Sequence, residues 1–372
     1  MAITEIRVYT AELPAKRLYT MSSSAVTVPQ STVVELIDSS GHHGHGEVCL
    51  ASPHYQPAHS AGVLASLELL APAVLGLDPV QHTRVNAALN AALDGHTEGK
   101  AAIDIACWDL AGKLFDRHVI DLLGGALSDR VSTYHVVAIA DADVAAAEAA
   151  ALQDAGLRRL QLKAGGRSID QDIASIRAVA ATLRPDTDLA VDTNRGWSTG
   201  EALQVSQACA DLRLAFEQPC ATEAELRHIK TQLRHPLIVD ENATDLATIA
   251  RLIASGTADG FGLKLSRLGG LTPMLAVRDL CRAARVPMSS DDAWGGDIIA
   301  AAGVALGATL TPQFSRGAWL AYPYHQTHYD PEHGPRLDGG CVTVPRGGPG
   351  LGLRLESGCF GDPVAIYTDS AV

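Results

Sequence analysis

The chain has 372 residues, of which 47% are hydrophobic and 19% are charged, and its formal net charge at pH 7 is −13. This length exceeds what one core usually supports, so we expect two domains, or a barrel with an added domain. The acidic balance argues against a nucleic acid or an anionic membrane surface as partner, because either would require clustered Lys and Arg. No apolar run reaches the roughly 18 residues that a membrane span requires.

The seven cysteines are scattered, without C-x-x-C spacing, and the N-terminus lacks the basic and apolar regions of a secretion signal. We therefore expect a reduced, cytoplasmic protein without structural disulfides. The negative net charge alone does not indicate a substrate.

The first third of the chain predicts strands followed by helices. Residues 3–9 alternate as an antiparallel strand does, and residues 32–38 are followed by a Gly-rich turn and a second strand. Two polar segments of small residues, which contain Tyr19 and Tyr55, are expected to be mobile loops. From residue 60 to residue 123 the spacing of apolar residues becomes helical. We expect residues 1–125 to form an α+β capping domain.

From residue 130 onward, short apolar runs alternate with helical segments. The repeat of roughly 25 residues per unit is typical of a (β/α)₈ TIM barrel, which we place at residues 126–325. After residue 326 the chain is rich in Gly and Pro, and we expect residues 326–372 to return to the capping domain. The candidate barrel strands are residues 134–139, 160–163, 189–192, 214–217, 237–240, 260–264, 287–290 and 310–314.

Three carboxylates stand at the ends of consecutive candidate strands. Asp192, Glu217 and Asp240 each follow a short apolar run directly. An ionised side chain at the end of a buried strand must be paired, hydrated or bound to metal. Because such ends meet at one rim of a barrel, the three acids predict a single site, and three hard oxygen ligands favour Mg²⁺ over Zn²⁺. Any one of them alone would be a surface acid ending a strand.

Two lysines occupy the same kind of position. Lys163 ends the second candidate strand and Lys264 ends the sixth, and these strands lie on opposite sides of a barrel. The lysines would then face each other across the metal site, where the cation and the other ammonium lower the pKa of each. One lysine would remove the α-proton of a carboxylate substrate, giving an ene-diolate stabilised by the metal, while the other would exchange a proton on the opposite face.

Four motifs together resemble the enolase superfamily, in its mandelate racemase and muconate lactonizing branch. The resemblance implies that Asp192, Glu217 and Asp240 bind Mg²⁺, that Lys163 and Lys264 are the acid/base residues, and that capping loops close the pocket. The family commonly has two lysines in the second strand, and the first helps to lower the pKa of the second. Here the strand reads Gln161-Leu-Lys163, so Lys163 lacks this helper and its strength as a base is in question. The motifs are Asp192-x-Asn194, Glu217-Gln-Pro219, Asp240-Glu241 and residues 263–270, and they place Asn194 and Glu241 beside the metal ligands.

The run after the seventh strand resembles that of family members acting on proline derivatives. Asp291 and Asp292, at the barrel rim, are expected to pair with a substrate cation, and Trp319 follows the eighth strand and offers an aromatic face for cation–π attraction. Tyr55 and Tyr19 would supply further aromatic faces from the loops. Each of these aromatic residues could equally be a packing residue.

The resemblance favours 2-epimerisation of proline betaine or hydroxyproline betaine, with dehydration of cis-3-hydroxy-L-proline as the alternative. Both reactions begin by removal of the α-proton. Cycloisomerisation or sugar-acid dehydration remains open, because a fold alone does not fix function. A binding protein without activity would have lost at least one ligand or lysine, and all are present. We expect a small-molecule enzyme that forms homo-oligomers.

Overall fold

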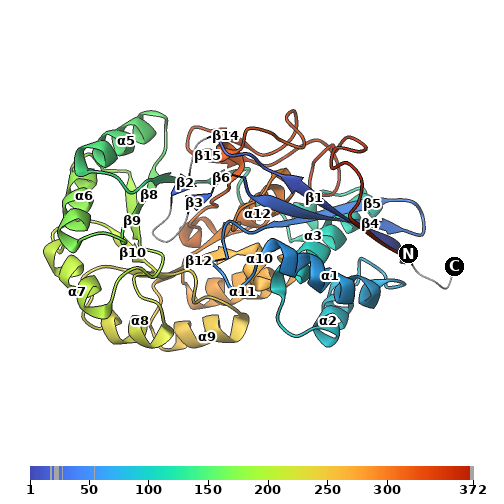
Figure 1. The fold of residues 1–372 in the computed structure, drawn as a ribbon, viewed down its shortest axis with the longest axis horizontal. Helices are drawn as coiled ribbons and strands as arrows, with labels where there is room; N and C mark the ends of the chain where they lie inside the picture. The colour runs from blue at the N-terminus through green and yellow to red at the C-terminus, as the bar shows by residue number, and fades with distance from the viewer. Residues whose placement is uncertain (17–18, 21–24, 27, 54, 369–372) are drawn as a thin grey trace.

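The computed structural model describes residues 1–16, 19–20, 25–26, 28–53 and 55–368. Two parts lie side by side (Figure 1): a capping part near the chain termini and a curled barrel sheet whose outer helices form the opposite end. This arrangement confirms the expected TIM-type barrel with an α+β cap. In the described part of the chain, no helix combines the length and the apolar character needed to cross a membrane.

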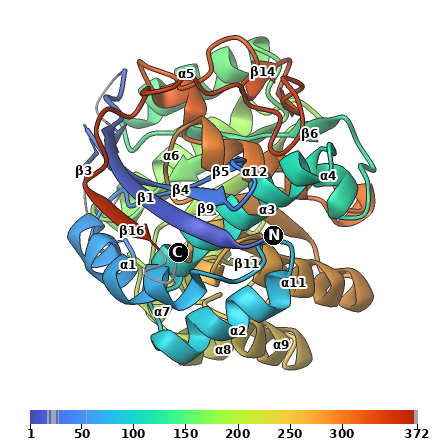
Figure 2. The ribbon, with the colours of Figure 1, turned by 90° about the vertical axis from the view of Figure 1, so that its right-hand side faces the viewer.

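The cap is built on a four-stranded antiparallel sheet in the order β16-β1-β4-β5 (Figure 2). Helix α3 packs closely on β5, because two glycines in that strand leave room for it: a Cβ added at Gly46 would lie 1.9 Å from the carbonyl oxygen of Ala102. The other face of α3 contacts α10 and α11 of the barrel, so α3 joins the two parts. The elements of the cap are β1 (Ile3–Glu12), β4 (Gln30–Asp38), β5 (His43–Cys49), β16 (Ala365–Thr368), α1 (Ser60–Val74), α2 (His82–Ala92), α3 (Thr97–Leu114) and α4 (Val119–Leu122), and a short pair, β2 (Tyr19–Thr20) and β3 (Ala25–Val26), follows β1.

The barrel sheet has seven parallel strands in the order β7 to β13, so sequence neighbours are neighbours in space. Parallel strands need a crossover, and helices supply it on the outer face. The strands are β7 (His135–Val137), β8 (Arg159–Lys163), β9 (Asp188–Asp192), β10 (Ala215–Glu217), β11 (Leu237–Val239), β12 (Gly260–Lys264) and β13 (Met288–Asp291). The helices are α5 (Ala142–Asp154), α6 (Ile169–Ala181), α7 (Thr199–Ala208), α8 (Glu223–Lys230), α9 (Leu246–Ala254), α10 (Leu265–Leu268), α11 (Leu271–Ala284) and α12 (Asp297–Ala308).

The expected eighth strand at residues 310–314 is wrong. Pro312 begins a 3₁₀ helix, Pro312–Phe314, and the chain becomes extended only afterwards. The segment from residue 315 to residue 319 closes the barrel instead: the Arg316 N–H donates to the carbonyl of Met288 (2.8 Å), and the Ala318 N–H donates to that of Ser132 (2.9 Å). Closure therefore rests on single bridges, which place Trp319 next to the end of β13.

Capping boxes start three consecutive barrel helices. In α6, α7 and α8 a Ser or Thr side chain accepts from the third helical N–H, and a Gln or Glu side chain reaches back to the cap. Each box satisfies two N–H groups that the helix itself cannot. Regular helix starts of this kind fix where each strand end and its loop lie, which matters for the residues that follow β8, β9 and β10.

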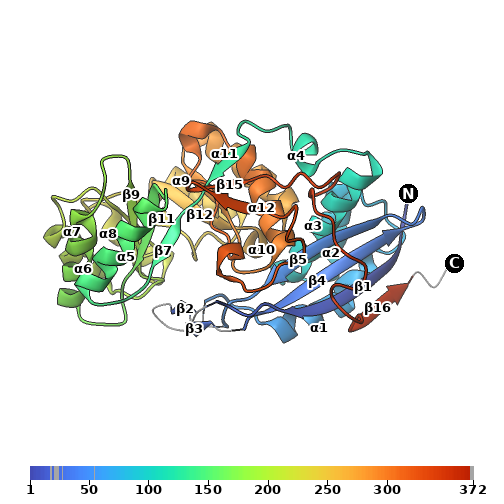
Figure 3. The same ribbon diagram turned by 90° about the horizontal axis from the view of Figure 1, so that it is seen from above.

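The C-terminal segment touches both parts. Strands β14 (Arg336–Asp338) and β15 (Cys341–Thr343) form a small sheet with β6 (Arg130–Ser132), near the start of the barrel. The last strand, β16, then pairs with β1 of the cap, as Figure 3 shows from above. Domain boundaries at residues 125 and 325 remain our proposal.

Candidate active site

One pocket lies at the carboxyl ends of the barrel strands, beneath the cap. Its space, including the mouth, is about 380 Å³. Polar groups from four barrel strands converge on it, and most of the other walls are aromatic. The lining residues are Ala51, Tyr55, Tyr134, Gln161, Lys163, Asp192, Asp240, Lys264, Ala293, Trp294 and Trp319.

Both predicted lysines line this pocket, and each is buried against a carboxylate. Lys163 Nζ lies 2.5 Å from Asp192 Oδ2, and Lys264 Nζ lies 3.0 Å from Asp240 Oδ2. Burial alone would lower the pKa of each ammonium, but the neighbouring carboxylates outweigh it and raise both pKa values. The lowering expected beside a bound cation stays a prediction, because acids are the nearest neighbours of both ammonium groups here.

The third predicted ligand, Glu217, is buried with one carboxylate oxygen unpartnered among the described residues. Its Oε1 accepts from the amide of Gln161 (2.9 Å), while its buried Oε2 has no hydrogen-bond partner among the described residues. Burial, with repulsion from Asp192 and Asp240, raises the pKa of Glu217 to about 7. The acids of this rim thus repel one another and favour either a proton or a cation between them.

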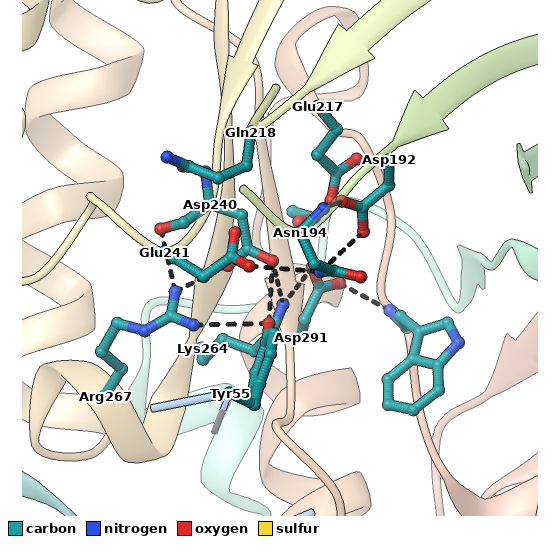
Figure 4. Close-up of polar contacts among 12 residues, drawn as sticks. Tyr55, Asp192, Asn194, Glu217, Gln218, Asp240, Glu241, Lys264, Arg267 and Asp291 are labelled. Atoms are coloured by element: carbon teal, nitrogen blue, oxygen red, sulfur yellow. Dashed lines mark hydrogen bonds and ion pairs between the residues drawn. The ribbon is translucent and has the colours of Figure 1, made fainter. Parts of the chain in front are cut away.

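Glu241, next to Asp240, is also buried with one carboxylate oxygen unpartnered among the described residues. Burial and the charges of Asp240 and Asp192 raise its pKa to about 8. Its Oε1 accepts from the amide of Asn194 (3.2 Å), whose own carbonyl oxygen accepts from Lys163 Nζ (3.0 Å). Figure 4 shows these side chains turned toward a common centre. Asn194 and Glu241 therefore lie where the sequence placed them, beside the three acids.

The backbone is strained within two residues after Asp192 and Glu217. Asn194 has φ 46° and Gln218 has φ 39°, values that side chains other than Gly seldom adopt. Gln218 is held by its neighbours: its Oε1 accepts from the Asp240 N–H (3.0 Å). Such strain persists only where surrounding contacts impose it, and it is common at active sites.

Several residues of the site were not assigned a role from the sequence. Arg267, on α10, donates to Asp240 Oδ1 (2.6 Å) and to the Asp240 carbonyl (2.9 Å). Burial alone would raise the pKa of Asp240, but the charges of Lys264 and Arg267 outweigh it and lower that pKa. Gln161 and Tyr134 line the pocket as well. Gln161 shares the inward face of β8 with Lys163, a period-two signal that could have identified it.

Tyr55 links the cap to the barrel at the pocket. Its hydroxyl donates to Asp240 Oδ2 (2.9 Å) and lies 3.4 Å from Arg267 Nη2. Its ring also lines a larger hollow of about 1240 Å³, mouth included, that opens between α1, α3 and the barrel loops. The side chain of Tyr19, the other expected loop aromatic, lies outside the described part of the structure.

The expected cation site at Asp291 and Asp292 is arranged differently. Asp291 accepts from the Trp319 N–H (2.6 Å) and from Ser289 Oγ (2.7 Å), and its carboxylate lies 3.8 Å from Lys264 Nζ. Asp292 is fully buried, and neither of its carboxylate oxygens has a hydrogen-bond partner among the described residues. Burial, followed by the charge of Asp291, raises the pKa of Asp292 well above its usual range. Neither carboxylate lines the pocket, whereas Trp319 does.

A divalent cation fits this donor set. In the described residues, no three His, Cys, Asp or Glu side chains already converge as a ready metal cluster, because the two ammonium groups lie against Asp192 and Asp240. The unpartnered Oε2 of Glu217 and the repulsion among the rim acids are what a bound cation would relieve. All candidate ligands are carboxylate oxygens, the type that Mg²⁺ prefers.

Comparisons with known proteins agree with this geometry. Residues 3–124 match the family model for the N-terminal domain of mandelate racemase and muconate lactonizing enzyme, and residues 144–358 match the enolase C-terminal domain-like model. The chain belongs to the mandelate racemase/muconate lactonizing enzyme family of the enolase superfamily.

Individual relatives in this family have different activities. The chain is 36% identical to a cis-3-hydroxy-L-proline dehydratase from Roseibium aggregatum, over 99% of this chain and 100% of the relative. It is 28% identical to an N-succinyl-L-Arg/Lys racemase from Bacillus cereus, over 73% of this chain and 75% of the relative. A solved enolase-superfamily structure from Roseovarius nubinhibens ISM, complexed with magnesium, has a TM-score of 0.93 at 30% identity and covers 99% of this chain and 100% of its own.

Proposed function

We propose that this enzyme removes the α-proton of a zwitterionic proline derivative, with Lys163 and Lys264 acting on opposite faces of the substrate. The observation that carries the proposal is that two buried lysines line one pocket together with strand-end carboxylates. Strands β8 and β12 are separated in the sheet by three others, so the lysines come from different sides of the barrel. A substrate between them would meet one amine on each face.

The residues that would hold Mg²⁺ are Asp192, Glu217 and Asp240. When bound, Mg²⁺ would offset the negative charge that develops on the substrate carboxylate as the α-proton leaves. Arg267 and Gln161 keep Asp240 and Glu217 in place through the hydrogen bonds described above. The magnesium complex of the Roseovarius relative supports this assignment.

Dehydration of cis-3-hydroxy-L-proline is the first candidate reaction. In this substrate the hydroxyl and the carboxylate share one ring face, so the α-hydrogen and the hydroxyl lie on opposite faces. One lysine would take the α-proton and the other would protonate the leaving hydroxyl; the C–H and C–O bonds break, a C=C bond forms and water departs. The full-length relative from Roseibium aggregatum supports this candidate.

The second candidate is 2-epimerisation of proline betaine or hydroxyproline betaine. Here the second lysine would return a proton to the opposite face of the same carbon. The aromatic wall supports it: the rings of Trp294 and Trp319 lie 5.7 Å apart and both line the pocket. A quaternary ammonium makes no ordinary N–H hydrogen bond and binds well to such faces. The full-length dehydratase relative supports dehydration as the first candidate, whereas the sequence pattern favoured epimerisation.

A direct assay separates the two reactions. The Mg²⁺-loaded enzyme is incubated in parallel with cis-3-hydroxy-L-proline and with the L and D forms of proline betaine, and the products are followed by NMR. Loss of the hydroxyl from the first substrate, with the betaines inert, supports dehydration. Interconversion of the betaines without loss of water supports epimerisation. Turnover of only a neutral sugar acid, included as a further substrate, would reject both reactions.

We also infer a reducing cytoplasmic location, which the seven free cysteines support.

A further inference from the structure

Another hollow lies at the other end of the barrel, where the strands begin. Its space, including the mouth, is about 1750 Å³, and its wall is formed by the first residues of β8, β9 and β10 and by the approach to β11 and β13. The pocket with the lysines is at the opposite, carboxyl end of the same strands. The two openings therefore share the barrel interior but not their lining residues.

This hollow is rich in cations although the chain as a whole has a net charge of −13. Two of the acids in its wall are already paired: Asp186 with Arg158 (2.8 Å) and Asp259 with Lys230. The remaining acid, Asp188, is exposed. The cationic side chains in the wall are Arg158, Arg159, Arg213, Lys230, Arg234 and Arg316.

Some of these arginines have an evident structural task. Arg158 donates to the carbonyls of Gln153 and Leu157, and Arg213 donates to those of Pro185 and Thr187. Carbonyl groups at helix ends and in the following turns need such donors. These two arginines are therefore explained by the loops that they hold.

Arg316 is not explained in this way, and Arg159 is explained only in part. Within the described part of the chain, neither guanidinium forms an ion pair with a carboxylate. Arg159 donates to the carbonyl of Arg316 and lies over the ring of Tyr134 (4.1 Å to its centre). The Nε of Arg316 is buried without a partner among the described residues, and no hydrogen bond from its guanidinium is found there.

The two guanidinium groups also repel each other. Burial, followed by the positive charge of Arg159, lowers the pKa of Arg316 to about 10. The carboxylates that act on Arg316 from a distance, Glu217 and Asp291, belong to the active-site end of the barrel. Gly260 packs against the side chain of Arg316: a Cβ added there would lie 3.4 Å from Arg316 Cδ and 2.9 Å from Ile238 Cδ1, so the missing side chain leaves room for the arginine. Two neighbouring cations with unused donors, facing open space, are the elements of an anion site.

We propose that Arg159 and Arg316 form a binding site for a small oxyanion of the phosphate class at the amino-terminal mouth of the barrel. The planar guanidinium of Arg316 would donate to two oxygens of the anion, and Arg159 would supply the second positive charge. The site lies at the other end of the strands and uses none of the lysines or rim acids as ligands. The charges of Arg159 and Arg316 act on Glu217 from a distance and oppose the rise of its pKa.

The test is isothermal titration of Mg²⁺-loaded enzyme with inorganic phosphate and, separately, with sulfate, at constant ionic strength set by chloride. We expect saturable binding of one anion per chain and a thermal midpoint that rises with the same concentration dependence. Arg316→Gln is expected to weaken binding at least tenfold. Arg159→Gln should weaken it in the same direction, and it serves if the first variant does not fold.

The matched control is Arg177→Gln on α6, which removes an equal charge from the exposed ion pair between Arg177 and Asp211. This variant should bind phosphate as the wild type does. Equal effects of chloride and phosphate would mean simple screening and would overturn the proposal. Undiminished binding in Arg316→Gln and Arg159→Gln would place the anion elsewhere, at the metal or the lysines, and would overturn it as well.

Discussion

At the scale of single residues, Asp192 tests the metal assignment. We expect Asp192→Asn to weaken Mg²⁺ binding by on the order of 10- to 100-fold, because a neutral amide replaces one of three carboxylates. Calorimetric titration with Mg²⁺ measures this directly, without reference to turnover. The control is Asp188→Asn at the exposed start of the same strand, β9, which should bind Mg²⁺ normally. Equal affinities in the two variants would remove Asp192 from the metal site.

Trp319 tests the aromatic wall. A cation–π contact contributes about 0.5 to 2 kcal/mol, so Trp319→Leu should cost roughly 2- to 30-fold in affinity for a betaine. The loss should be smaller for cis-3-hydroxy-L-proline, whose NH₂⁺ group can form hydrogen bonds instead. Ratios of kcat/KM for the two substrates measure the difference, with Tyr322→Leu, outside the pocket, as control. A loss that is equal for both substrates would mean that Trp319 only packs.

At the scale of elements, Glu47 joins the cap to the start of α12. This fully buried residue of β5 accepts from the N–H groups of Gly296 (2.8 Å) and Ile299 (3.1 Å). Glu47→Ala would leave both buried donors without a partner, and we expect it to lower the free energy of unfolding by about 1–3 kcal/mol. It should also raise KM, because Ala293 and Trp294 of the pocket precede α12 directly.

Urea denaturation and steady-state kinetics check this prediction, with Glu12→Ala at the exposed end of β1 as the control. That variant should change stability by no more than about 0.5 kcal/mol. If Glu47→Ala is as stable as the control, the contact between β5 and α12 does not hold the two parts together.

A partly buried histidine on the cap sheet predicts how stability depends on pH. His45 lies between Glu35 (3.4 Å) and Asp109 (3.8 Å). Burial alone would lower the pKa of His45, but the two carboxylates outweigh it and raise the pKa above 6.5. Because the pKa of His45 is higher in the folded protein, its protonation stabilises the fold. This stabilisation is complete below the unfolded pKa, about 6.5, and is lost as the pH rises through the pKa of the folded state. The pKa values of Glu35 and Asp109 are lowered, so their contributions are lost only in acid.

The difference in unfolding free energy between wild type and His45→Gln should therefore be largest near pH 5.5 to 6.5 and shrink toward pH 9. Urea titrations across this range measure it. His228→Gln, an exposed histidine of α8, should show no comparable trend. A difference that grows with pH would mean that His45 is held neutral in the folded protein.

The elements also show where sequence patterns succeed. The strands from β7 to β13 were predictable because each is a short apolar run between helical segments, repeated many times. The eighth was placed too early, because the apolar residues around Pro312 read as a strand while the proline starts a 3₁₀ helix. The closing segment carries Gly317 and alternates poorly, so local pattern could not locate it.

At the scale of the whole molecule, the site was predictable only where strand ends mark it. Asp192, Glu217 and Lys264 follow apolar runs directly, so topology alone brings them together. Arg267 reaches Asp240 through the short helix α10, and Asp291 turns to Trp319 and Lys264; both depend on tertiary packing that no periodicity encodes. The same limit applies to substrate choice, which side-chain placement in the pocket decides.

The central claim is that Lys163 and Lys264 exchange the α-proton on opposite faces of one substrate, and hydrogen–deuterium exchange tests it most directly. L- and D-proline and their betaines, which lack a leaving hydroxyl, are incubated in D₂O with Mg²⁺-loaded wild type, Lys163→Ala and Lys264→Ala. NMR then follows the α-position, with Lys230→Ala as a control that should match the wild type. We predict that the wild type exchanges both stereoisomers of at least one pair, and that each active-site variant keeps exchange with only one of them, a different one in each case. The account would be contradicted if either variant exchanged both stereoisomers at the wild-type rate, or if the wild type exchanged neither.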